Sequence, residues 1–121
     1  MVGMRIARLA FALALLAAPP ALADEPDLRA LAGVAAKLRP VQDRWERCLA
    51  RAVQPQIAGN RAPAAVADRA LQSCREEEGR LRRALVRAVG RAEATGVMAQ
   101  LVATQRRSLI AAIAELRARR R

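Results

Sequence analysis

The sequence predicts an all-α fold: an antiparallel helical hairpin closed by a disulfide, with a third helix packed on it as in a small three-helix bundle. Three observations lead to this prediction. The chain is rich in Ala, Arg, Leu and Glu, which all favour helices. Strand-forming aromatic and β-branched residues are scarce and never alternate with polar residues over a usable length. Apolar residues recur instead at steps of three and four, which is the period of one helix face.

The first element is predicted to be a cleavable signal peptide at residues 1–23. Arg5 and Arg8 give it a short basic start, about ten uninterrupted apolar residues follow, and a double proline precedes the small residues Ala21 and Ala23. A membrane-spanning helix needs about 20 apolar residues, so a membrane anchor fits less well. We therefore expect export by the general (Sec-type) route, cleavage after Ala23, and a periplasmic or secreted protein with no transmembrane segment after cleavage.

The mature chain, residues 24–121, is expected to form a single helical domain of 98 residues with 20 basic and 11 acidic side chains, a net charge of +9. The mature chain lacks residues on which several kinds of catalysis and cofactor binding depend. There is no His, which is the commonest general base and metal ligand. There is also no C-x-x-C motif and no Gly-rich phosphate loop. We therefore expect no catalytic residues, no metal site and no cofactor, and we predict that the protein is not an enzyme.

The first helix of the mature chain is predicted to start at the acidic segment 24–27, because acidic side chains and an early proline both suit a helix N-terminus. Pro40 is expected either to kink this helix or to start a second segment. Its apolar face comprises Leu28, Leu31, Val34 or Ala35, Leu38, Val41, Trp45, Cys48 and Ala52.

The second helix is predicted to begin at Pro63, after a break over residues 54–62. In this break, Gly59-Asn60 is a candidate for the left-handed conformation that closes a helix. The apolar side of the second helix comprises Ala67, Ala70, Leu71, Cys74, Leu81, Leu85 and Ala88.

The third helix is predicted to be capped by Thr95, because Gly90 and Gly96 weaken the helical pattern around it. Gln105 interrupts its apolar face, which comprises Val97, Leu101, Leu109, Ala112 or Ile113, and Leu116.

Cys48 and Cys74 are the only cysteines, and an even count in an exported chain predicts a disulfide. If the first helix continues through Pro55 to Ala58, Cys48 lies about 15 Å below its top. Cys74 then lies about 18 Å below the top of the second helix, so the two heights nearly match. If the first helix instead stops at Val53, the offset between the two cysteines grows to roughly 10 Å and the loop must compensate. The expected bond therefore favours a helix that continues, kinked, through Pro55. A redox-active pair is the alternative. We favour a structural bond, because catalytic cysteines are close in sequence and near a helix N-terminus, and we expect neither feature here.

Two surface features are candidates for binding a partner. Trp45, on the same face as Cys48, is expected to cover the disulfide and the core, with a partner-binding anchor as the alternative. The net charge indicates weak contact with anionic envelope components, with a merely solvated arginine surface as the alternative. Nucleic acid is not expected as a partner, because the chain is exported and has few aromatic rings for base stacking. The candidate basic residues are Arg106, Arg107, Arg117, Arg119, Arg120 and Arg121.

Trp45-Glu-Arg-Cys48, followed by Ala70-Leu-Gln-Ser-Cys74-Arg-Glu-Glu, resembles small exported proteins of unknown function from high-GC Gram-negative bacteria, with a W-x-x-C and then an A-x-x-x-C pattern. Gln42, Trp45 and the two cysteines are also similar to periplasmic lysozyme-inhibitor-like domains, whose tyrosines and asparagines are missing here. Leu101-Val-Ala-Thr-Gln105 resembles the L-T-x-x-Q motif of helical-hairpin periplasmic chaperones, with Val102 in place of the Thr.

These observations lead to one functional hypothesis with two alternatives. The protein is expected to be an exported, non-catalytic helical protein that binds another protein or an anionic envelope component. A chaperone-like role and a lysozyme-inhibitor-like role are the alternatives.

Overall fold

The structure is a computed structural model that describes residues 25–121, so the predicted signal peptide lies outside the described residues. Within this range the chain is helical almost throughout and has no β-strand, which confirms the all-α prediction. Residues up to Gly33 form one unit and Val34–Arg121 form another, and the packing described below is that of the second unit. The elements are α2 (Glu25–Val53), the 3-10 helix η2 (Gln54–Gln56), α3 (Pro63–Ser73), α4 (Arg75–Val89) and α5 (Arg91–Arg119).

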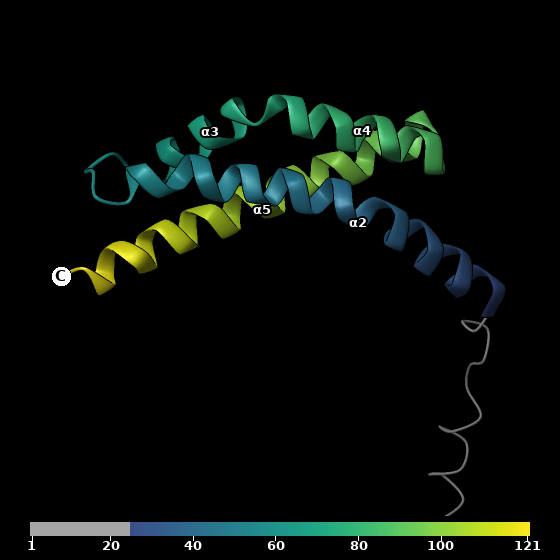
Figure 1. The fold of residues 1–121 in the computed structure, drawn as a ribbon, viewed down its shortest axis with the longest axis horizontal. Helices are drawn as coiled ribbons and strands as arrows, with labels where there is room; N and C mark the ends of the chain where they lie inside the picture. The colour runs from purple at the N-terminus through teal and green to yellow at the C-terminus, as the bar shows by residue number, and fades with distance from the viewer. Residues whose placement is uncertain (1–24) are drawn as a thin grey trace, which may run out of the picture. The chain divides into compact units, whose positions relative to one another are not determined.

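The three arms of the second unit run antiparallel in turn (Figure 1). α2 leads into the turn after η2, α3 and α4 run back along it one after the other, and α5 returns beside them. α5 packs against both α3 and α4. The predicted hairpin with a third helix on it is therefore confirmed, with the second arm divided into two helices.

The prolines of the first arm do not start new α-helices. Pro40 lies inside α2 and does not end it. α2 itself ends at Val53, and the chain continues as a tighter 3-10 helix over Gln54–Gln56 with Pro55 inside it. The expected continuation through Pro55 is therefore made by a 3-10 turn and not by the α-helix. Neither Gly59 nor Asn60 has a positive φ, so the predicted left-handed closure of this arm is wrong. Pro63 begins α3, as predicted.

The second arm breaks at Cys74, which the sequence pattern did not predict. The backbone of Cys74 has φ −105° and ψ 25°, away from helical values, although its N–H still donates to Ala70 O at 3.1 Å. The Ser73 hydroxyl donates to the Arg69 carbonyl oxygen at 2.9 Å. A side-chain bond of this kind competes with the backbone and often bends helices. The apolar pattern continues across the break, because both helices face the same core.

α5 begins at Arg91, directly after Gly90, so the prediction that Thr95 caps this helix is wrong. Gly90 has φ +88°, the only positive φ among the described residues, and this left-handed conformation suits glycine. Thr95 lies inside α5, where its hydroxyl donates to Arg91 O at 2.9 Å.

The core lies between the three arms and is apolar, with no buried charged side chain among the described residues. It combines large side chains of α2, above all Trp45 and Leu49, with small residues of α3 such as Ala67 and Ala70. The remaining buried residues are Val53, Ile57, Val66, Cys74, Leu81, Leu85, Ala94, Met98 and Ile113.

Candidate functional site

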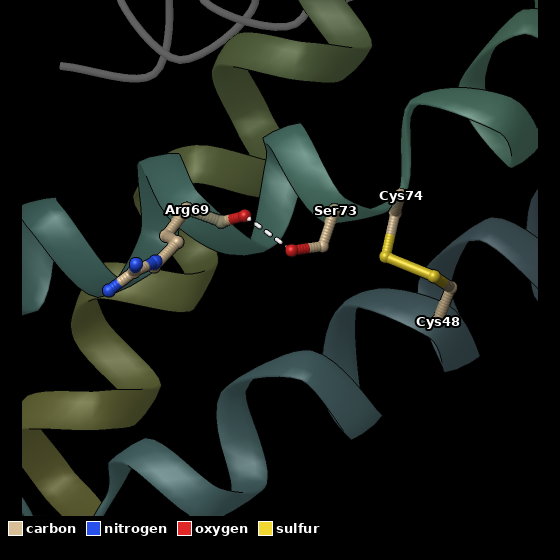
Figure 2. The surroundings of a disulfide bond; sticks show 4 residues. All are labelled: Cys48, Arg69, Ser73 and Cys74. Atoms are coloured by element: carbon tan, nitrogen blue, oxygen red, sulfur yellow. Dashed lines mark hydrogen bonds between the residues drawn. A yellow bond between two sulfur atoms is a disulfide. The ribbon is translucent and has the colours of Figure 1, made fainter.

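The disulfide joins α2 to the junction of α3 and α4 (Figure 2). The Cα atoms of Cys48 and Cys74 lie 5.9 Å apart, within the usual range for a disulfide. This confirms the predicted bond. Cys74 is completely buried, whereas Cys48 is partly exposed.

One part of the sequence argument about the cysteines is wrong, because Cys74 does lie at a helix N-terminus. It is the residue that precedes α4. A helix N-terminus favours a thiolate, but here the first turn of α4 carries Glu76, Glu77 and Glu78, whose negative charges oppose one. Together with the complete burial of Cys74, this acidic turn supports a structural bond rather than a reactive one.

Trp45 is completely buried in the core. Its position agrees with the interpretation that the indole covers the core, and it places the side chain away from any surface that a partner could touch. The indole Nε1 has no hydrogen-bond partner. A buried N–H without a partner carries a desolvation cost of about 1–3 kcal/mol, so Trp45 stabilises the fold by its size rather than by its polar atom.

Two of the predicted basic residues are engaged with carboxylates. Arg106 Nε lies 2.7 Å from Asp68 Oδ1 and joins α5 to α3. The hydrogen bond from Arg106 lowers the pKa of Asp68, and the same bond raises the pKa of Arg106. Arg119 pairs with Glu115 one turn earlier, at 2.6 Å. Both pairs are exposed, so their charges are locally balanced rather than available to a distant partner.

Arg117 has a structural role that sequence reasoning missed. Its Nε donates to Ile57 O at 3.1 Å and its second terminal nitrogen to Gln56 O at 3.0 Å, and the guanidinium also donates to Arg61 O. These carbonyls lie at the end of the first arm and in the turn after it, where a helix leaves acceptors unsatisfied. Arg117 therefore closes the first arm in place of the predicted Gly59-Asn60.

The other C-terminal arginines are less constrained. Arg107 donates to Thr104 Oγ1 at 3.3 Å and is exposed. Arg120 and Arg121 are exposed and form no ion pair with any described residue. The six candidates therefore differ in their partners, from the ion pairs of Arg106 and Arg119 to the exposed Arg120 and Arg121.

A different group of arginines does share a site. Arg83 and Arg87 of α4 line two adjoining grooves, one on each side of the helix. Arg44 of α2 lines the first groove, of about 210 Å³, and Arg91 of α5 lines the second, of about 530 Å³. We call these four residues the arginine cluster. All four are exposed, and none forms an ion pair within the described part of the chain.

The two grooves combine charge with an apolar lining. Val41 and Ala84 line the first groove, together with Glu77 and with Arg80, which is paired with Glu76 at 2.7 Å. The lining of the second groove includes Val86, Ala94 and Thr95, together with Arg82, which pairs with Glu78 at 3.5 Å. The grooves therefore suit an anion better than a cation, and an anion with an apolar part better than a small inorganic one.

The sequence held a partial signal for the cluster. Arg83 and Arg87 are four residues apart on α4, which places like charges on one helix face. Arg91 belongs to α5, beyond the left-handed Gly90, so this spacing does not place it on that face. Arg44 could not be added from the sequence, because only the packing of α2 beside α4 brings it to the groove. The interruption of the apolar face of α5 at Gln105 has a partner that the sequence did not indicate. Its Nε2 donates to Glu46 Oε1 at 3.0 Å and links α5 to α2.

Compared with known proteins, the chain matches no family model, no curated protein and no solved structure. Among residues 25–121, no group of three or more His, Cys, Asp or Glu side chains is placed to hold a metal ion. In the same range, no helix has an apolar stretch long enough to cross a bilayer.

Proposed function

We propose that the mature chain is an exported, non-catalytic helical protein that binds an anionic component of the cell envelope through its arginine-rich surface. The observation that carries this proposal is the arginine cluster, in which four exposed guanidinium groups line two adjoining grooves without a carboxylate partner.

The charge balance of residues 34–121 supports the proposal. This segment has 19 basic and 8 acidic side chains. Four ion pairs, made by Asp68, Glu76, Glu78 and Glu115, use half of the carboxylates. Most of the arginines therefore contribute to a positive field that attracts anionic surfaces.

The disulfide supports the location. Disulfides persist in oxidising compartments such as the periplasm and are rare in the cytosol. The bond between Cys48 and Cys74 therefore agrees with the exported fate proposed from residues 1–23.

Binding to vesicles tests the proposal. The mature chain, residues 24–121 with its disulfide formed, is sedimented with vesicles of phosphatidylcholine alone or with added phosphatidylglycerol. We expect binding only to the anionic vesicles, and we expect it to weaken strongly between 0.1 M and 1 M salt, because the screening length falls from about 10 Å to about 3 Å. Equal binding to both vesicles, or anionic binding that high salt leaves unchanged, would overturn the proposal.

An acidic protein surface is the alternative partner, and pull-down of one purified acidic envelope protein without vesicle binding would favour it. The chaperone-like hypothesis needs an exposed apolar face. The exposed large apolar side chains of the described chain are Leu31, Val97 and Leu116, which belong to α2 and α5. No observation favours this role or the lysozyme-inhibitor-like one, and both stay predictions.

A further inference from the structure

We infer that the arginine cluster is a binding site for a phosphorylated amphiphile, a molecule that carries a phosphate group next to an apolar moiety. This inference rests on the proposed function and deepens it, because it names both the site and the chemistry of the anion. The site consists of Arg44, Arg83, Arg87 and Arg91 with the apolar residues between them.

The first step of the argument is the position of Arg83 and Arg87. They are the only residues that line both grooves, so they form the ridge between them. They lie one helical turn apart on α4. Like charges at this spacing destabilise a helix. An anion bound between them would remove this repulsion and make charge-assisted hydrogen bonds to both.

The second step is the charge that the first groove would see. Arg44, Arg83 and Arg87 are unpaired there, the charge of Arg80 is balanced by Glu76, and Glu77 contributes one negative charge to the lining. The balance of about two positive charges matches a phosphate monoester, which is close to a dianion near neutral pH. Arginine is also the side chain that best fits phosphate oxygens, because its planar fork can donate two parallel hydrogen bonds.

The third step is the apolar lining. A free phosphate ion needs only donors, yet Val41 and Ala84 border the arginines on one side, and Val86 and Ala94 border them on the other. The groove beside α5 is the larger of the two, at about 530 Å³ against about 210 Å³. We therefore place the phosphate at Arg83 and Arg87 and the apolar moiety along the larger groove.

The test uses the disulfide-bonded mature chain and three probes: dodecyl phosphate below its micelle concentration, inorganic phosphate, and neutral dodecyl maltoside. Calorimetry measures each affinity. We expect dodecyl phosphate to bind at least tenfold more tightly than either of the other two, because only it has both parts. If inorganic phosphate binds as tightly as dodecyl phosphate, the inference that the ligand needs an apolar moiety is wrong. If dodecyl maltoside binds as tightly, the inference that the arginines recognise the phosphate is wrong.

Matched variants locate the site. The double variant Arg83→Gln/Arg87→Gln should lose at least tenfold in affinity for dodecyl phosphate, whereas Arg120→Gln/Arg121→Gln, with the same change in charge, should stay within twofold of the parent. Glu77→Gln should bind more tightly, since it removes the one carboxylate of the first groove that faces the anion without a partner. Equal losses in the two double variants would show a diffuse charge effect and overturn the site. All the substituted arginines are exposed, and circular dichroism checks that each variant is folded.

Failure of this inference and failure of the proposed function give different results. If the parent chain binds anionic vesicles, and both double variants bind the vesicles and dodecyl phosphate as tightly as the parent does, the site is wrong and envelope binding stands. If the parent chain ignores anionic vesicles but binds dodecyl phosphate through Arg83 and Arg87, the site stands and envelope-surface binding is wrong.

Discussion

Arg117 Nε donates a hydrogen bond to the carbonyl oxygen of Ile57, 60 positions earlier in the chain, at 3.1 Å. This contact ties the last turns of α5 to the end of the first arm. Helix ends need partners for their carbonyls, and here a distant side chain supplies one where the local sequence does not.

Replacing Arg117 should therefore destabilise the fold. Hydrogen bonds from a charged donor contribute about 1.5–3 kcal/mol each, and Arg117 makes three that share one partly exposed guanidinium. We expect Arg117→Ala to lower the free energy of unfolding by about 2 kcal/mol, measured by urea denaturation. The matched control is Arg121→Ala, which should change stability by less than about 0.5 kcal/mol. Equal effects of the two substitutions would contradict the capping role.

Two glycines only six positions apart should respond in opposite directions to alanine. Gly90 has φ +88°, which strains any side-chain-bearing residue, whereas Gly96 lies inside α5 with open space around the position of a Cβ atom. Gly90→Ala should lower stability by about 1 kcal/mol or more. Gly96→Ala should raise it by about 0.5–1 kcal/mol. Thermal melts of both variants test this, and a stabilised Gly90→Ala would refute the left-handed junction.

Reduction of the disulfide should lower the melting temperature markedly. The bond closes a segment of 26 positions, for which the chain-entropy model gives about 3.5 kcal/mol. The double variant Cys48→Ala/Cys74→Ala should melt in the same low range as the reduced protein. A melting temperature that strong reductant leaves unchanged would rule out a structural role for the bond.

The ion pair between Arg106 and Asp68 should contribute to acid sensitivity. The hydrogen bond from Arg106 lowers the pKa of Asp68 in the folded state. At acidic pH, the carboxyl of Asp68 therefore binds fewer protons in the folded state than in the unfolded state. The resulting stabilisation is complete above the unfolded pKa of about 3.9 and is lost as the pH falls through the lowered folded value. Asp68→Asn should therefore lower stability slightly at pH 6 and by a smaller amount at pH 2. Because the pair is exposed, salt should shrink the difference at pH 6. A loss at pH 2 as large as that at pH 6 would contradict this linkage.

The helical period predicted the three arms, but not where each of them ends. Apolar residues continue at helical steps through Cys74, so nothing in the pattern marks the break, which depends on the Ser73 hydroxyl and on packing. At the start of α5, Gly90 and Thr95 both carried helix-boundary signals, and the glycine marks the boundary because it alone accepts a positive φ.

The candidate site was harder to predict for a different reason. A run of arginines near the C-terminus stands out in the sequence, but the partners that occupy Arg106 and Arg117 lie 38 and 60 positions away. Conversely, the arginine cluster is assembled from three helices, and only its α4 portion was visible as a spacing. Charge density along a chain does not reveal which charged side chains already have partners in the fold.

The continuity of α5 has a mechanical consequence. A break such as the one at Cys74 could serve as a hinge between α3 and α4. α5 runs unbroken for 29 residues and packs against both of them, so it restricts motion at the junction between α3 and α4. The disulfide ties the same junction to α2. The break at Cys74 is therefore held on both helices, and α4 keeps its orientation relative to α3 and carries its arginines with it.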